Sequence, residues 1–126
     1  MVEETTLQGL SILVVEDVLL VAEAIGDGLE SYGCTVVGPV ARLEPALALA
    51  REAPLDGAVL DVNLAGRSSA PIAEILSQRG IPFVFVTGYG ADTALPPEYR
   101  NVPRLTKPFQ IRNLAQLASE CFRPQE

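Results

Sequence analysis

The residues of this sequence that are best suited to chemistry stand where short apolar runs end. Glu16 and Asp17 follow the run SILVV, Asp61 ends AVLD, Thr87 ends PFVFVT, and Lys107 follows RLT. Carboxylates packed together repel each other, and a hard cation with oxygen ligands, such as Mg²⁺, relieves that repulsion. A carboxylate beside the cation can then attack phosphorus, while a hydroxyl and an ammonium group hold the charge of the transferred phosphoryl group.

Each of these residues alone has an ordinary explanation. An aspartate such as Asp17 or Asp61 can cap a helix or begin a loop. A threonine such as Thr87 is common in strands, and a Lys-Pro pair at a strand end is often an exposed turn. These separate explanations do not account for all five residues in this order, so their co-occurrence favours one phosphoryl-transfer site.

The surrounding pattern alternates short apolar runs with longer amphipathic stretches. It predicts strands over residues 11–16, 35–40, 58–61, 82–87 and 103–106, and helices over residues 18–32, 43–53, 71–79 and 111–122. Residues 63–69 are predicted to be a polar loop. The alternation indicates an α/β protein with a doubly wound, five-stranded parallel sheet. Such sheets bind ligands at the carboxyl ends of their strands, where the candidate residues lie.

The stretch between the fourth and fifth predicted strands breaks this rhythm. A helix is due over residues 91–102, but Pro96 and Pro97 lie within it and the apolar residues show little periodicity. Because proline removes a backbone donor and clashes with the preceding turn, we expect a short or irregular helix there.

The composition narrows the possible functions. The chain has 126 residues with 48% hydrophobic content, which fits one packed domain, and no apolar run is long enough to span a bilayer. A net charge of −7 disfavours nucleic acid and anionic membranes as partners. Cys34 and Cys121 lie in apolar stretches, which favours free thiols in a reducing cytoplasm. The chain has no histidine, so phosphohistidine can come only from a partner.

Four segments resemble the response-regulator receiver domain: ILVVED, VLDVNL, VFVTGYG and LTKPF. The resemblance covers residues 9–122 and leaves residues 1–8 and 123–126 as loose termini. It implies the flavodoxin-like receiver fold, with strand order 2-1-3-4-5. The segments PFVFVTGYG and LTKPF also resemble single-domain bacterial receivers with a Phe-x-Thr-Gly-Tyr-Gly type motif.

The resemblance also implies the roles of individual residues. Glu16 and Asp17 would hold Mg²⁺, and Asp61 would be the phosphoacceptor. The backbone carbonyl of Asn63 would be a further metal ligand, Thr87 would bind the phosphoryl group, Lys107 would pair with it, and the Lys107–Pro108 bond would be cis. The phosphodonor would be a histidine kinase or a histidine phosphotransfer protein. The chain would then be a cytoplasmic signalling switch or relay component that transfers and hydrolyses its own phosphoryl group, without being a turnover enzyme.

The residues that would transmit phosphorylation depart from the common pattern. Many receivers carry tyrosine or phenylalanine three residues before the active-site lysine, whereas this chain has Arg104. We therefore take Thr87, Tyr89 and Arg104 as the candidate switch residues, with residues 91–102 as a segment that could change conformation.

Three other functions fit parts of the pattern. A nucleotide-binding domain would need a glycine-rich turn after the first strand, where this chain has VVEDVLL. A metal-dependent nuclease would use a glutamate at the end of the first strand and a DxD pair. In this chain Asp61-Val62-Asn63 is DxN, and the net charge of −7 disfavours nucleic acid. A receiver-like scaffold that works without phosphorylation stays open, because the residue pattern does not distinguish it from the switch.

Overall fold

A computed structural model of the chain describes residues 7–88 and 95–122. Its centre is a five-stranded sheet in the order β2-β1-β3-β6-β7, in which every neighbouring pair is parallel. The strands are β1 (Ser11–Val15), β2 (Thr35–Val40), β3 (Gly57–Asp61), β6 (Phe83–Thr87) and β7 (Arg104–Thr106). Counted among the five predicted strands, this order is 2-1-3-4-5. The predicted doubly wound, flavodoxin-like fold is therefore confirmed.

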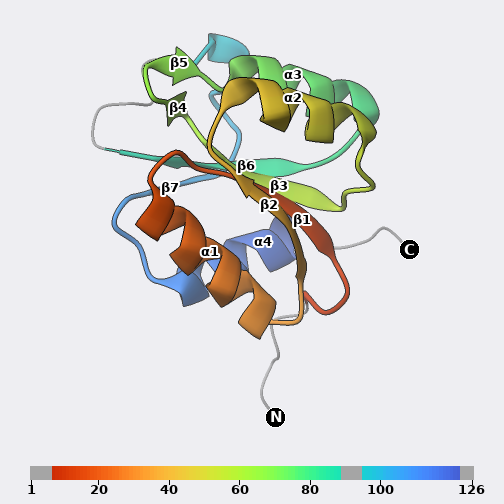
Figure 1. Cartoon of the computed structure of the whole chain (residues 1–126), viewed down its shortest axis with the longest axis vertical. Helices are drawn as coiled ribbons and strands as arrows, with labels where there is room; N and C mark the ends of the chain where they lie inside the picture. The colour runs from red at the N-terminus through yellow and green to blue at the C-terminus, as the bar shows by residue number, and fades with distance from the viewer. Residues whose placement is uncertain (1–6, 89–94, 123–126) are drawn as a thin grey trace.

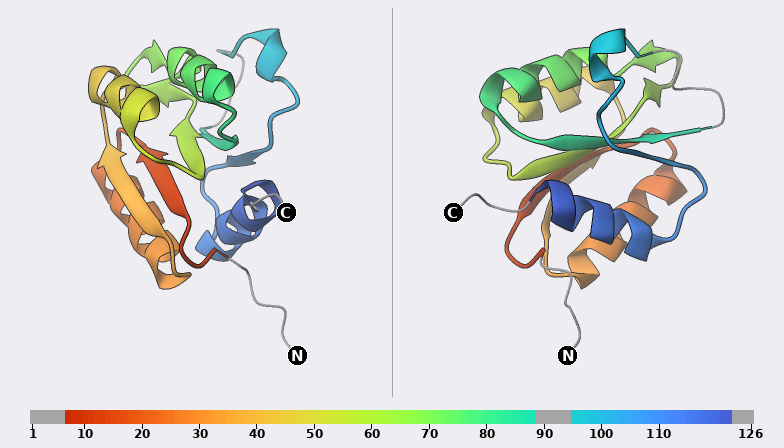
Figure 2. Two further views of the ribbon diagram at one scale, coloured as in Figure 1. Left: turned by 90° about the vertical axis from the view of Figure 1, so that its right-hand side faces the viewer. Right: turned by 180° about the vertical axis from the view of Figure 1, so that it is seen from behind.

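Helices cover both faces of the sheet (Figures 1 and 2). One face carries α1 (Leu19–Ser31) and α4 (Ile111–Cys121), and the other carries α2 (Leu43–Glu52) and α3 (Ala70–Arg79). In α1 the buried positions Ala22, Ile25 and Leu29 recur at helical spacing, which is why one stripe of this helix packs on the sheet.

The core consists of two apolar layers, one on each side of the sheet. In β1, Leu13 and Val15 point into the layer with α2 and α3, whereas Ile12 and Val14 point into the layer with α1 and α4. Both layers exclude water from the strand, and all five residues of β3 are likewise buried. The continuous apolar runs of the sequence therefore correspond to strands that are covered on both faces.

Glycines allow α1 to pack closely against its neighbours. A Cβ at Gly28 would collide with the side chain of Ile111 on α4, so this position needs glycine for the two helices to meet. A Cβ at Gly26 would instead lie 3.7 Å from Pro39, which is an ordinary van der Waals contact. The two helix glycines thus have different steric requirements.

Of two connecting segments, one differs from its prediction and the other agrees with it. Residues 63–69, predicted to be a loop, contain an antiparallel hairpin of β4 (Asn63–Leu64) and β5 (Arg67–Ser68). Between β6 and β7, the described residues 95–102 contain only the 3₁₀ turn η2 (Pro97–Tyr99), which confirms the prediction of a short or irregular helix. Tyr89 and residues 90–94 lie outside the described residues.

The ends of the described chain pack against the domain. Leu7, in the stretch expected to be loose, is fully buried beside the α1 and α4 layer. Cys34 is buried, Cys121 is half-buried, and both are free thiols. Within residues 7–88 and 95–122, none of the helices has the length and apolar character needed to cross a bilayer.

Candidate functional site

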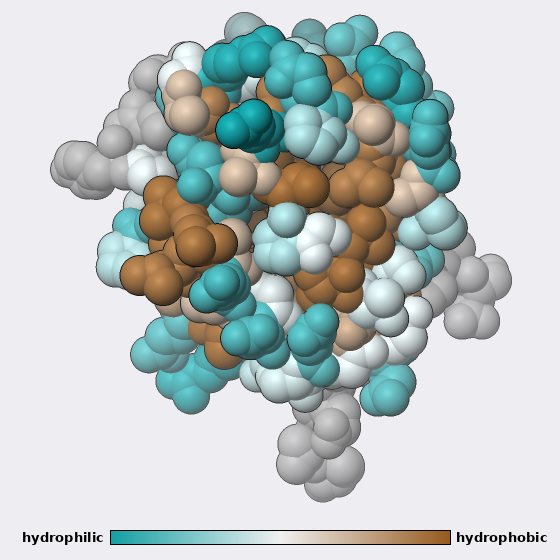
Figure 3. Space-filling model, viewed as in Figure 1, coloured by the Kyte–Doolittle hydropathy of each residue, from teal (hydrophilic) through white to brown (hydrophobic). Residues whose placement is uncertain are grey.

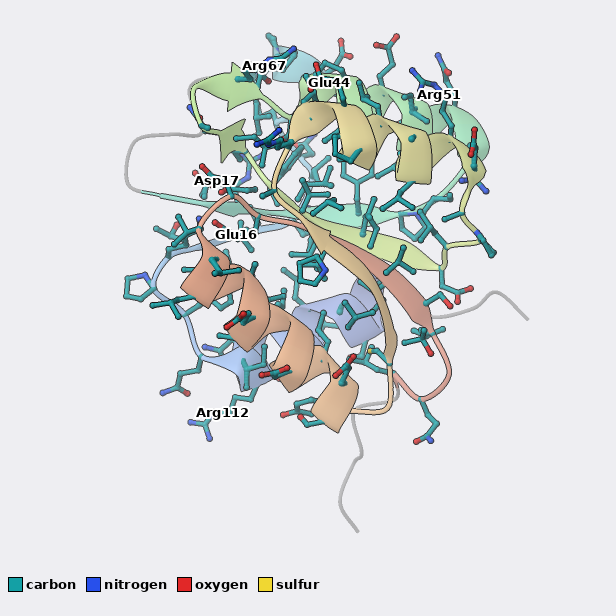
Figure 4. The ribbon with its side chains drawn as sticks, in the orientation of Figure 1. Glu16, Asp17, Glu44, Arg51, Arg67 and Arg112 are labelled. Carbon is teal, nitrogen blue, oxygen red and sulfur yellow. The ribbon has the colours of Figure 1, made fainter. Side chains whose placement is uncertain are left out.

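The carboxyl ends of β1 and β3 bring the three predicted carboxylates together. Glu16, Asp17 and Asp61 each offer an oxygen atom, and these oxygens lie within 4.8 Å of one another. Glu16 is 1% exposed and Asp61 is 4% exposed, whereas Asp17 is half-buried. Figure 4 shows Glu16 and Asp17 at the carboxyl end of β1, near the hairpin of β4 and β5. The convergence follows from the parallel register of β1 and β3, which pairs Val15 with Leu60, because Glu16 and Asp61 are the next residues in the chain and Asp17 follows Glu16.

Lys107 connects two of the three carboxylates. Its Nζ lies 2.9 Å from Oε1 and 3.1 Å from Oε2 of Glu16, and 3.1 Å from Oδ2 of Asp61. The lysine follows β7, and its backbone N–H donates to the carbonyl of Thr87 at 2.8 Å. The Lys107–Pro108 bond is cis, as the resemblance implied. The only lysine of the sequence therefore lies against the predicted phosphoacceptor.

The electrostatics of this cluster oppose the ionisation of Asp61 in the absence of a cation. Burial, together with the charge of Glu16 and the hydrogen-bonding carboxyl of Asp17, raises the pKa of Asp61 from 3.8 to about 7. Lys107 acts in the opposite direction but does not outweigh these effects. Burial lowers the pKa of Lys107, but hydrogen bonds to Glu16 and Asp61 and their charges outweigh it, so the lysine pKa is raised.

The donor atoms of the cluster fit a magnesium ion. All of the candidate side-chain ligands are carboxylate oxygens, which a hard divalent cation prefers over nitrogen or sulfur. Oε1 of Glu16 is buried and accepts no well-formed hydrogen bond from the described residues, although the lysine ammonium lies beside it. A buried acceptor of this kind has capacity for a cation, and a cation would offset the mutual repulsion of the carboxylates.

The hairpin that the sequence reasoning missed also reaches this cluster. The backbone N–H of Ala65, in the turn between β4 and β5, donates to Oδ2 of Asp17 at 2.9 Å. The backbone N–H of Asn63 donates to Oδ1 of Asp61 at 3.3 Å. In the sequence, Gly66 within a short polar stretch was the available signal for a tight turn. The contact of Ala65 with Asp17 had no such signal, because the two residues are 48 positions apart.

Two of the three candidate switch residues, Thr87 and Arg104, lie on the neighbouring strands β6 and β7, and Tyr89 lies outside the described residues. Thr87 is 3% exposed at the end of β6, and its hydroxyl donates to the carbonyl of Gly88 at 3.0 Å. Arg104 contacts the η2 turn: its Nη2 donates to the carbonyls of Tyr99 and Arg100 at 2.8 and 3.0 Å. Its guanidinium carbon lies 5.9 Å from the centre of the Phe85 ring. Arg104 therefore joins β7 to the η2 turn.

Comparisons with known proteins agree with this geometry. The family model of the response regulator receiver domain matches residues 12–119. The solution structure of SdrG from Sphingomonas melonis Fr1 is 42% identical with a TM-score of 0.78, and the alignment covers 88% of this chain and 95% of SdrG. The BeF3-activated conformation of SdrG from Pseudomonas melonis Fr1 is 39% identical with a TM-score of 0.70, covering 95% of this chain and 98% of that one.

A longer protein is similar over part of its length. The response regulator PhyR from Brucella abortus is 30% identical with a TM-score of 0.78, and the alignment covers 94% of this chain but 49% of PhyR. This chain thus corresponds to about half of PhyR. A search of curated protein sequences gave no significant match. The family match over residues 12–119, the similarity to SdrG and the acidic cluster at the strand ends agree, and the chain belongs to the response-regulator receiver domain family.

Proposed function

We propose that this chain is a signalling switch in which Asp61 accepts a phosphoryl group from phosphohistidine of a partner protein. Receiver domains as a family are phosphorylation-controlled signalling domains, and the proposal adds the acceptor, the donor and the cation. The observation that carries it is the contact of the Lys107 ammonium with Asp61 at 3.1 Å, inside a buried acidic cluster. An ammonium group beside the nucleophile is suited to hold the charge of a transferred phosphoryl group.

The residues present suit the binding of Mg²⁺. We infer that Glu16, Asp17, Asp61 and the backbone carbonyl of Asn63 hold the ion, which supplies positive charge to the acceptor carboxylate and to phosphoryl oxygens. Because the pKa of Asp61 is raised to about 7 in the metal-free protein, the positive charge of a bound ion would favour its ionised, nucleophilic carboxylate at neutral pH.

The transfer then follows from the chemistry of the acceptor. A carboxylate oxygen of Asp61 forms a bond to phosphorus as the phosphorus–nitrogen bond of phosphohistidine breaks, and the imidazole leaves and takes up a proton. Water later attacks phosphorus, which breaks the acyl phosphate bond, releases inorganic phosphate and regenerates the carboxylate. The Thr87 hydroxyl, now bonded to a backbone carbonyl, would have to turn toward the phosphoryl group to stabilise it.

The surface beside the cluster supports a protein as the phosphodonor. Val18, Leu19 and Leu20 in and before the first turn of α1 are 49%, 69% and 77% exposed. Figure 3 shows hydrophobic atoms gathered over this end of α1. A groove of about 320 Å³ continues from Leu20 to Lys107 and Pro108. Apolar surface that reaches an active-site lysine suits a partner helix that presents a histidine to Asp61.

Phosphorylation with an acyl phosphate donor and Mg²⁺ tests the proposal. The unaltered chain and an Asp27→Asn control, which changes an exposed carboxylate on α1, should take up the label, whereas Asp61→Asn should not. Equal labelling of Asp61→Asn would refute Asp61 as the acceptor. Beryllofluoride with Mg²⁺ should change the NMR spectrum of a switch, and a scaffold that works without phosphorylation would show no response. A metal-dependent nuclease would instead cleave DNA or RNA.

A second variant separates chemistry from signalling. Lys107→Ala should lose phosphorylation-dependent binding to the partner while it still takes up label, because the lysine contacts the acceptor but is not itself the nucleophile. The measurement compares the binding of labelled and unlabelled protein to a histidine kinase or phosphotransfer protein. Undiminished phosphorylation-dependent binding by the variant would contradict this role.

A further inference from the structure

The hairpin between β3 and α3 has a backbone conformation that calls for a physical reason. Asn63 pairs with Ser68 and Leu64 pairs with Arg67, which leaves Ala65 and Gly66 as the two turn residues. Their φ angles are 52° and 91°, the sign pattern of the type I′ turn that suits two-residue hairpins. Among the described residues, Ala65 is the one non-glycine residue with a positive φ, a conformation that an L-residue adopts at an energetic cost.

The strained turn makes specific contacts on its inner side. The Ala65 amide donates to Oδ2 of Asp17 at 2.9 Å, and the Asn63 amide donates to Oδ1 of Asp61 at 3.3 Å. The turn itself is closed by the Asn63 side chain, whose Oδ1 accepts the N–H of Gly66 at 2.7 Å. Two backbone amides of one hairpin therefore contact two carboxylates, Asp17 just after β1 and Asp61 at the end of β3.

The outer side of the hairpin is attached to the rest of the domain. Leu64 is 2% exposed and packs into the core layer with α2 and α3. Arg67 forms an ion pair with Glu44 at the start of α2, with 3.0 Å between Nη1 and Oε2, and Figure 4 labels both residues above the sheet. The core contact of Leu64 anchors the hairpin, whereas the ion pair is exposed and adds little.

We propose that this hairpin is a positioning element for the metal site, with Asn63 acting through its side chain as well as through its backbone. The inference rests on the proposed function, because it assumes that Asp17 and Asp61 are ligands of Mg²⁺. Asp17 is only half-buried, so its side chain has freedom to adopt other rotamers. The Ala65 amide holds one oxygen of Asp17 and leaves the other for a cation. Groups that orient metal ligands in this way commonly change metal affinity by 10- to 100-fold.

A matched pair of glycine variants tests the proposal. Gly66 and Gly80, at φ 91° and 74°, would each receive a Cβ with no described atom within 4 Å. Both positions have a positive φ, so alanine is strained at each of them, but of the two only Gly66 lies in the turn that contacts Asp17. We expect Gly66→Ala to weaken Mg²⁺ binding about tenfold, and Gly80→Ala to bind within twofold of the unaltered chain.

One further variant examines the Asn63 side chain. Asn63→Ala removes the acceptor that closes the turn and should also weaken Mg²⁺ binding about tenfold. Dissociation constants come from Mg²⁺ titrations followed by NMR amide shifts, with thermal unfolding in EDTA to verify that every variant is folded.

The outcomes separate this inference from the function on which it rests. Tenfold weaker binding in Gly66→Ala and Asn63→Ala, with Gly80→Ala unchanged, would support the hairpin as a positioning element. Unchanged Mg²⁺ binding in both hairpin variants would overturn the inference alone. A failure of the unaltered chain to bind Mg²⁺ would overturn the proposed metal site and the inference together.

Discussion

The raised pKa of Asp61 leads to a counter-intuitive prediction: removing the charge of the proposed phosphoacceptor stabilises the metal-free fold. We consider Asp61→Asn, which keeps the shape of the side chain and removes its negative charge. Asp61 is 4% exposed and lies beside Glu16, so its ionisation is opposed by burial and by a like charge. The carboxamide avoids both effects at every pH.

The size of the effect follows from linkage. In the unfolded chain Asp61 ionises near 3.8, whereas in the folded chain its pKa is about 7. Because the folded pKa is the higher one, the folded state gradually loses stability as the pH rises from 3.8 to about 7. This interval of about 3 pH units corresponds to about 4 kcal/mol at 1.36 kcal/mol per pH unit. We expect about 2 kcal/mol, because the carboxamide must itself be desolvated, whereas the opposing effect of Lys107 is already included in the folded pKa of about 7.

The assay is thermal or urea unfolding in EDTA at pH 8 and at pH 4.5. At pH 8 Asp61→Asn should unfold about 8 °C above the unaltered chain, since 1 kcal/mol shifts the midpoint of a domain of this size by about 4 °C. At pH 4.5 most of the difference should vanish, because Asp61 in the folded chain is then protonated. An Asp27→Asn control, at an exposed position, should change stability by less than about 0.5 kcal/mol at either pH.

Mg²⁺ should reduce the difference in stability between Asp61→Asn and the unaltered chain. Mg²⁺ at ten times its dissociation constant stabilises a protein that binds it by about 1.4 kcal/mol, and Asp61→Asn lacks one proposed ligand. The difference at pH 8 should therefore narrow when Mg²⁺ replaces EDTA. The reasoning is refuted if Asp61→Asn is no more stable than the unaltered chain at pH 8 in EDTA, because Asp61 would then ionise without the opposing effects described.

The remaining predictions concern the lysine, the helix glycines and the arginine. Lys107→Ala should lower the unfolding free energy in EDTA by about 3 kcal/mol, because it leaves buried carboxylates unpaired. Mg²⁺ should restore part of this loss. If Mg²⁺ stabilises the variant no more than it stabilises the unaltered chain, this explanation is contradicted. Urea unfolding should find Gly26→Ala stabilised by about 0.5 to 1 kcal/mol. Gly28→Ala should instead be destabilised by about 1 to 3 kcal/mol through its collision with Ile111; equal shifts would contradict the packing argument. Arg104→Ala should cost about 1 to 2 kcal/mol and speed amide exchange in residues 97–102, and unchanged exchange would exclude its link to the η2 turn.

Some departures from expectation depended on contacts that no local pattern reveals. The hairpin of residues 63–68 has only two residues in each strand, which is too short for a periodic signal. Arg104 occupies the position of an aromatic switch residue in many receivers, but in this structure it donates to the backbone carbonyls of the η2 turn. Those carbonyls are acceptors because the proline-rich segment ends after one 3₁₀ turn, so the role of the arginine depends on the fold of its neighbours.

The sequence by itself determined the five strands of the sheet and the order of the helices, and it indicated the candidate site residues. This was possible because apolar periodicity is local, and because parallel strands bring their carboxyl ends to one edge of the sheet. Only the tertiary structure decided how those residues meet. Lys107 contacts Glu16 and Asp61 from 91 and 46 residues away, and the Ala65 amide reaches Asp17 across 48 residues. The raised pKa of Asp61 likewise depends on burial and on the distance to other charges, which exist only after the strands have assembled.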